Sequence, residues 1–264
     1  MKIVLPGLVS YDEALTLQED LHRRVVAGGG NEAYLVLLEH PPVITIGRGG
    51  SAANVLADAA ALEREGIAMR TTGRGGDVTY HGPGQLVAYP IVDLRHHGGG
   101  RDVHRYLRDL EQVVIDMLAE FGIVGRREAG MTGVWTNGGK VAAIGVAIRR
   151  WVTFHGFAVN ADPNMDHFNL IVPCGIADGE VASMSALLGR PVGVEDTIEP
   201  TIRHFAAVFG FQVPSPCQGE GQGEGGGVNP SPGACTGDRS RGRLRHIFLP
   251  AKERVATDLN RERG

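Results

Sequence analysis

A change in composition near residue 214 limits how much of this 264-residue chain can fold. Between Pro214 and Gly242, glycine and proline make up nearly half of the residues, and Val228 is the only aliphatic residue larger than alanine. Burial of so few apolar side chains cannot offset the conformational entropy that this segment would lose on folding. We therefore expect 214–242 to be a disordered linker. The prediction is one domain over residues 1–213, then this linker, then a charged tail over 243–264.

Within the first 213 residues, apolar side chains repeat either with helical spacing or in short strand-like runs. Ser10 and Glu13 form a capping-box pattern at the start of one such helix. The spacing predicts helices over 10–27, 58–65 and 101–121 and within 195–209, and strands at 34–38, 43–46, 67–72, 85–92, 140–148 and 151–159. Pro90 lies inside 85–92, which indicates a strand that ends early or lies at a sheet edge.

The order of these elements decides between fold classes. The strand runs do not alternate regularly with the helices, which argues against a doubly wound parallel sheet. The prediction is an α/β domain of the α+β type, with one mixed central sheet and flanking helices.

Charge and hydropathy narrow the range of partners. A formal net charge of −4 and a pI of about 6.2 show no basic excess, so no nucleic-acid partner is expected. No apolar run is long enough to span a bilayer, and the first residues lack the charged and apolar regions of a signal peptide. A cytoplasmic protein without a membrane partner is the expectation. The histidines are not grouped at metal-ligand spacings, so no metal is predicted.

The cysteines also restrict the chemistry. There are three, Cys174, Cys217 and Cys235, with no C-x-x-C pair, so neither a disulfide framework nor a zinc ribbon is indicated. Cys217 and Cys235 lie in the expected linker and are assigned no function. Cys174 follows an apolar run and sits between proline and glycine, a setting that can present a thiol instead of packing it.

The run from Arg74 to Gln85, RGGDVTYHGPGQ, is the most unusual in the chain. It lies between two predicted strands and is longer than a simple connection requires. Its adjacent glycines let the backbone approach a ligand closely, and Arg74 and His81 could donate hydrogen bonds to it. We therefore expect this loop to bind substrate.

Two glycine-containing stretches match nucleotide-binding patterns only in part. Before Lys140 the P-loop pattern fails, because Val134 stands where glycine is required and Val141 where serine or threonine is. The run GRGGSA at 47–52 matches a relaxed dinucleotide fingerprint, but no βαβ pattern surrounds it. A nucleotide cofactor is not predicted.

Small residues over 141–147 indicate a site for an alkyl chain, because they leave space beside a strand, although plain tight packing explains them equally well. A thiol reacts as its thiolate, and a neighbouring cation favours that form. The residues alone leave Lys140, His81 and His155 open as the neighbour of Cys174.

Three segments together resemble one known family. They are RGGDVTYHGPGQLVAYP at 74–90, GGKVAAIGVAIRRWVTFHGFAVN at 138–160 and VPCG at 172–175. In order and spacing they resemble the LipB family, the octanoyl-(acyl carrier protein):protein N-octanoyltransferases, over roughly residues 1–213. The resemblance implies a fold related to the biotin and lipoate protein ligases. It also implies transfer of an octanoyl or lipoyl group from the phosphopantetheine of acyl carrier protein to a lysine of a lipoyl domain, without ATP or metal. The implied acceptors are the lipoyl domains of 2-oxoacid dehydrogenase E2 subunits and the glycine cleavage H protein.

The resemblance also implies roles for individual residues. Cys174 would form an acyl-thioester intermediate, and Lys140 would lower the pKa of its thiol and act in the acid/base steps. The implied substrate-binding residues are Arg74, Gly75, Gly76, Asp77, Val78, Thr79, Tyr80, His81, Ala143, Ile144, Gly145, Gly156, Phe157 and Ala158. Three rival interpretations are an ATP-dependent lipoate or biotin ligase, a non-catalytic binding module, and a cysteine hydrolase using Cys174 and His155.

Overall fold

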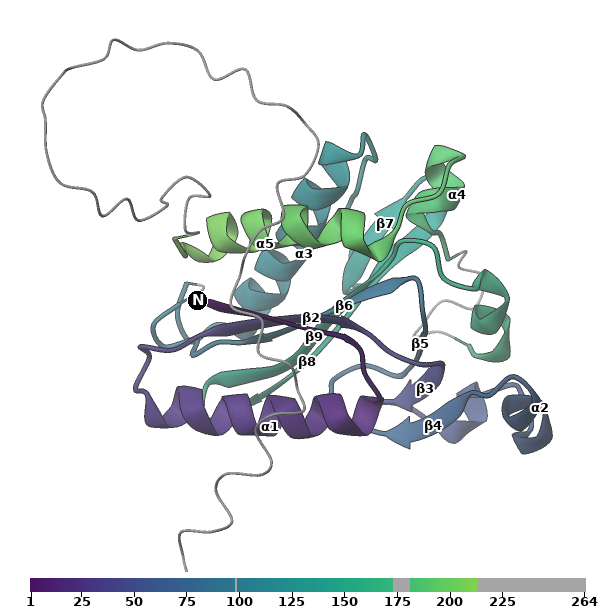
Figure 1. Cartoon of the computed structure of the whole chain (residues 1–264), viewed down its shortest axis with the longest axis horizontal. Helices are drawn as coiled ribbons and strands as arrows, with labels where there is room; N and C mark the ends of the chain where they lie inside the picture. The colour runs from purple at the N-terminus through teal and green to yellow at the C-terminus, as the bar shows by residue number, and fades with distance from the viewer. Residues whose placement is uncertain (98, 173–180, 213–264) are drawn as a thin grey trace, which may run out of the picture.

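A six-stranded mixed sheet forms the centre of the molecule (Figure 1). The computed structural model describes residues 1–97, 99–172 and 181–212, so Cys174, the 214–242 segment and the 243–264 tail lie outside the described residues. The strands in spatial order are β1 (Lys2–Leu8), β2 (Tyr34–Glu39), β6 (Gln85–Ile91), β9 (Val152–Asn160), β8 (Gly139–Arg149) and β7 (Gly133–Thr136). β1 runs parallel to β2 and the other neighbours are antiparallel, which confirms the predicted mixed sheet.

Helices cover both faces of this sheet (Figure 1). Helix α1 (Tyr11–Ala27) packs on one face against Val36 and Leu38, and α3 (Val103–Glu120) and α5 (Val194–Phe209) pack on the other against Leu35 and Leu37. β2 is therefore buried on both faces, because successive side chains of a strand point to opposite sides. The predicted helices are confirmed, and the capping box of Ser10 is formed as expected.

A second, three-stranded sheet was not predicted from the sequence. Its order is β4 (Ala68–Thr71), β3 (Val43–Ile46) and β5 (Val78–His81), and helix α2 (Ala59–Arg64) packs beside it. The glycine-rich run is thus not one long loop, because β5 lies within it and pairs with β3. Val78 and Tyr80 drive this pairing by burying their side chains in an apolar cluster with Ile44 and Leu62.

Pro90 lies inside the main sheet, so the expected early end or edge position of this strand is wrong. β6 continues through Pro90 and sits between β2 and β9. Proline cannot donate to the ladder, and the neighbouring strand β9 adapts to it. The Thr153 hydroxyl donates to the Pro90 carbonyl at 2.7 Å, and His155 adopts a left-handed φ of 55° with its N–H directed to Gln18 Oε1 at 2.8 Å.

The β8–β9 hairpin is the longest antiparallel pairing, and it forms the floor on which the site is built. Arg150 and Trp151 form its turn with φ of 55° and 65°, the two positive angles of a type I′ turn. The remaining elements are helix α4 (Met184–Leu188) and two 3₁₀ turns, η1 (Ala52–Asn54) and η2 (Met165–Leu170). None of the helices in the described residues is both long and apolar enough to cross a membrane.

Candidate active site

A cavity of about 640 Å³ lies between the glycine-rich run, the β8–β9 hairpin and the start of helix α3. This volume is in the range of small-molecule sites. Lys140 and all the expected substrate-binding residues except Tyr80 line it. Tyr80 is buried in the cluster of the small sheet, with its hydroxyl 2.7 Å from His167 Nδ1.

The segment that carries Cys174 lies outside the described residues, but described residues on both sides of it line the cavity. Phe168 precedes this segment in the sequence and Val181 follows it, and both are lining residues. Val181 also forms a parallel bridge with Lys140.

Lys140 is held close to the floor of the cavity by its own strand and by β7. Its Nζ lies 4.9 Å from the centre of the Trp135 ring, within the range of a cation–π contact. Gly133 lies behind the side chain, and a Cβ at this position would approach Lys140 Cε to 2.7 Å. Glycine at 133 therefore leaves the space that the lysine stem occupies.

The glycine-rich loop lies directly on β8. The Gly75 N–H donates to the Val146 carbonyl at 2.8 Å, and a Cβ on Gly145 would approach Gly75 O to 2.9 Å. Arg74 is buried, and its guanidinium donates to the Thr45 carbonyl at 2.7 Å. The sequence predicted that Arg74 donates to a ligand. The structure shows that its side chain holds the loop to β3.

The GRGG run at 47–50 supports the same loop. The N–H groups of Gly47 and Gly49 donate to the carbonyls of Asp77 and Gly76 at 3.0 and 3.1 Å. A Cβ on Gly47 would collide with the Gly76 carbonyl. The weak dinucleotide pattern thus has a structural explanation, which is the close contact of two backbones.

Two lining residues that sequence reasoning missed are Gln85 and Asn160, which are buried and paired across β6 and β9. Gln85 Oε1 lies 3.1 Å from His81 Nδ1, and Gln85 Nε2 donates to Asn160 Oδ1 at 2.9 Å. Asn160 then donates to the Ala182 carbonyl at 3.0 Å, and the Ala182 N–H donates to Lys140 O at 2.9 Å. Both residues stand within the family motifs, but only the register of β6 against β9 shows that they pair.

His81 and His155 line the cavity in their neutral forms. Burial, followed by the charges of His40 and Arg74, lowers the pKa of His81 to about 3. Burial, followed by the charges of Arg74 and Arg48, lowers the pKa of His155 to about 4. Neither ring supplies a cation at neutral pH, whereas a lysine is ordinarily charged there. The two histidines therefore do not supply the cation that we expected beside Cys174.

The lowered pKa values of His81 and His155 predict that the protein loses stability in mild acid. In the unfolded chain both rings bind protons below about pH 6.5. In the folded protein His155 binds a proton only near pH 4 and His81 only near pH 3. The free energy of unfolding should therefore fall as pH drops from 6.5, by up to about 1.4 kcal/mol per pH unit for each histidine.

Urea unfolding at pH 6.5 and pH 4.5 measures this dependence. In His155→Gln the difference between the two pH values should be smaller than in the wild type by up to about 2 kcal/mol. An unchanged difference would show that His155 does not titrate in this way.

The described residues contain no group of three His, Cys, Asp or Glu side chains arranged as metal ligands. Apolar residues that line the cavity include Ala143 and Ile144 of the small-residue strand and Leu107 of α3. The lining thus combines apolar side chains with Lys140.

Comparison with known sequences places the chain among lipoylation proteins. The lipoyl protein ligase A/B catalytic domain family matches residues 10–206. An octanoyltransferase of Geobacter metallireducens is 50% identical over 208 residues, covering 79% of this chain and 93% of that protein. An octanoyltransferase of Gloeobacter violaceus is 50% identical over 211 residues, covering 80% and 90%.

Solved structures share the fold at low sequence identity. Lipoate-protein ligase A bound with ATP has a TM-score of 0.65 and 17% identity, covering 78% of this chain and 84% of the ligase. A putative lipoate protein ligase from Thermoplasma acidophilum with bound lipoic acid has a TM-score of 0.63 and 16% identity, covering 78% and 85%. These likenesses confirm the expected ligase-type fold.

Proposed function

Since this chain belongs to the lipoyl protein ligase A/B catalytic domain family and is an octanoyltransferase, we propose that it moves the acyl group in two steps through a thioester on Cys174. The observation that carries the proposal is the cavity that joins Lys140 to a strand of small residues. Described residues on both sides of the Cys174 segment line this same cavity.

In the first step the Cys174 thiolate attacks the thioester carbonyl of octanoyl-acyl carrier protein. The bond from the carbonyl carbon to the phosphopantetheine sulfur breaks, and that sulfur leaves as a thiol after taking a proton from Lys140. In the second step a lipoyl-domain lysine amine attacks the acyl-Cys174 carbonyl, an amide forms, and the Cys174 thiolate is released. Lys140 takes the proton lost by the amine.

This scheme makes ATP unnecessary, because the first step exchanges one thioester for another. An ATP-dependent ligase is the nearest rival, since lipoate-protein ligase A shares the fold and is bound with ATP in its structure. Incubation of the enzyme and a lipoyl domain with octanoyl-acyl carrier protein alone, and separately with free octanoate and ATP, distinguishes the two. We expect octanoylation only in the first mixture, and product only in the second would favour the ligase.

The acceptors that we propose are the lipoyl domains of 2-oxoacid dehydrogenase E2 subunits and the glycine cleavage H protein. An archaeal lipoate ligase of the same fold, 18% identical, was studied with its E2 lipoyl domain. A free cysteine nucleophile stays reduced most readily where disulfides do not form, so we propose a cytoplasmic location. The match over 10–206 supports residues 1–213 as the catalytic domain, and the composition of the remaining residues is the basis for proposing 214–242 as a linker and 243–264 as a tail.

The proposed path of the acyl chain along β8 predicts that filling the cavity changes the substrate range. Ala143 lines the cavity in the middle of the strand. Ala143→Leu should lower kcat/KM for octanoyl transfer by roughly 10–100-fold, because several methylene groups lose their space, and should affect butanoyl transfer much less.

Ala147→Leu is the matched control, because this alanine lies on the same strand outside the cavity lining. Transfer rates from carrier proteins loaded with four- and eight-carbon chains provide the measurement. If Ala143→Leu lowered both rates equally, the chain would lie elsewhere.

A further inference from the structure

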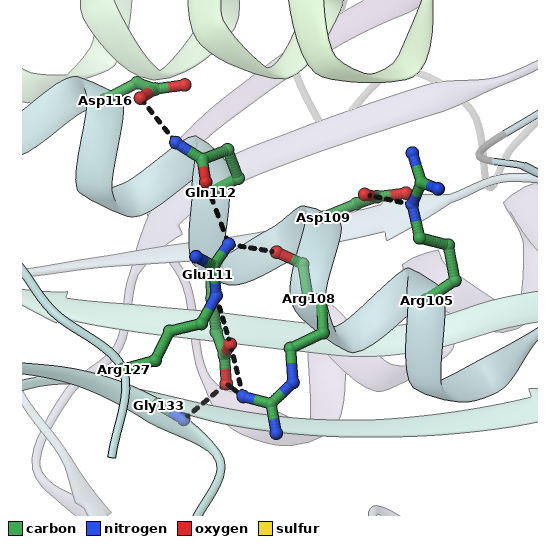
Figure 2. Close-up of polar contacts among 8 residues, drawn as sticks. All are labelled: Arg105, Arg108, Asp109, Glu111, Gln112, Asp116, Arg127 and Gly133. Atoms are coloured by element: carbon green, nitrogen blue, oxygen red, sulfur yellow. Dashed lines mark hydrogen bonds and ion pairs between the residues drawn. The ribbon is translucent and has the colours of Figure 1, made fainter. Parts of the chain in front are cut away.

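A carboxylate on helix α3 is completely buried outside the cavity. Glu111 is 0% exposed, and Arg108 Nη1 donates to its two oxygens at 2.7 and 2.9 Å (Figure 2). Arg127 Nε donates to Oε2 at 2.9 Å, and the Gly133 N–H donates to Oε1 at 3.2 Å. A buried carboxylate is tolerated only with such partners, so these three donors and Glu111 form one unit.

Two of these donors stand at the ends of one segment, residues 127–133. Arg127 also donates to the Arg108 carbonyl at 3.0 Å and to Gln112 Oε1 at 2.9 Å, so its side chain lies along α3 (Figure 2). One carboxylate therefore fastens both the beginning and the end of the segment to the helix.

The middle of this segment is a wall of the cavity. Gly130, Met131 and Thr132 line it together with residues of β8 and Leu107 of α3. Met131 is only half-buried, and a thioether side chain adapts its shape easily. The contacts with Glu111 therefore act together with the backbone bridge of Arg126 to Trp135 and the pairing of Gly133 with Ala143 to hold the two ends of this wall.

The same attachment reaches Lys140. Gly133 is the last residue of the segment, and a Cβ at this position would lie 2.7 Å from Lys140 Cε. A shift of the Gly133 backbone would therefore change the space available to the lysine stem.

We propose that Glu111 is a positioning residue that sets the acyl-chain specificity of this enzyme. By fixing both ends of 127–133, it holds Met131 and Thr132 at a defined distance from β8 and Gly133 behind Lys140. The inference rests on the proposed function, in which this cavity holds the octanoyl chain. A loosened segment would give way to longer chains that the native wall rejects.

Glu111→Gln tests this role. Glutamine has nearly the same size and can still accept the Gly133 hydrogen bond, but it lacks the charge that binds the two guanidinium groups. Hydrogen bonds to a charged group stabilise more than those to a neutral one, so the loss of the charge should weaken the attachment of 127–133. We expect the ratio of octanoyl to dodecanoyl transfer to fall about tenfold. Both carrier-bound chains are offered in competition, and mass spectrometry of the lipoyl domain gives the ratio.

Arg127→Met tests the same attachment with Glu111 still paired to Arg108 and Gly133. It should shift the ratio in the same direction and retain the fold even if Glu111→Gln does not. Asp109→Asn is the matched control, because Asp109 pairs within α3 with Arg105 Nε at 2.7 Å (Figure 2). This variant should keep the wild-type ratio.

The proposal is overturned if Arg127→Met folds and keeps the wild-type ratio, whether or not both rates fall, since the attachment to Glu111 would then not set the chain-length specificity. Failure of the proposed function is recognised by a separate measurement. It would appear as octanoyl transfer that is retained in Cys174→Ser.

Discussion

Cys174→Ser is expected to lower kcat/KM for octanoyl transfer by roughly 10³-fold or more. A serine hydroxyl remains protonated near neutral pH even beside a lysine ammonium, so the variant lacks the anion that attacks the thioester. Transfer of the octanoyl group from acyl carrier protein to a lipoyl domain, followed by mass spectrometry of the domain, measures the effect.

The other two cysteines provide controls of the same chemistry. Cys217→Ser and Cys235→Ser alter residues of the 214–242 segment and should retain the wild-type rate. A Cys174→Ser enzyme that kept its activity within a few-fold would show that the acyl group reaches the acceptor without Cys174.

Lys140→Met is expected to lower the same rate by about 10²–10³-fold. Methionine keeps the apolar stem over Trp135 but removes the ammonium, so the pKa of the Cys174 thiol should rise and the proposed proton transfer by Lys140 is lost. The rate of Cys174 alkylation as a function of pH reports the thiolate, and it should move to higher pH in this variant.

Lys140→Arg separates the two roles of the lysine. A guanidinium keeps the positive charge but does not release its proton, so alkylation should remain fast at neutral pH while transfer stays slow. Lys2→Met is the control, because Lys2 lies on the outer strand β1 and pairs with Glu32 at 2.7 Å. If Lys140→Met kept both the alkylation profile and the transfer rate, Lys140 would have neither role.

Elements with local signals could be predicted from the sequence. The capping box of Ser10, the helical spacing of α3 and the β8–β9 hairpin all depend on residues close together in the chain. The interior position of Pro90 could not be predicted, because its accommodation depends on His155 turning its N–H to Gln18 on a distant helix. Propensity at Pro90 indicated an edge, and tertiary hydrogen bonds overrode it.

The candidate site could also be predicted only in part. The predicted catalytic and substrate-binding residues stand in the three family motifs, and those that the structure describes line the cavity, apart from Tyr80. Tyr80 alternates with its neighbours along β5 and is buried on the apolar side of that strand. Met131 and Thr132 stand in no motif, and their place at the cavity depends on contacts of their segment with distant residues, namely the pairing of Gly133 with Ala143 and the hydrogen bonds to Glu111.

The acyl-enzyme itself is the most direct test of the central claim. The wild-type protein is mixed with octanoyl-acyl carrier protein in the absence of a lipoyl domain, and its peptides are analysed by mass spectrometry. The account predicts one octanoyl group on the peptide containing Cys174, and its loss to the lipoyl domain once the domain is added. Transfer that proceeds at the full rate with no adduct on Cys174, or with the octanoyl group on another residue, would contradict it.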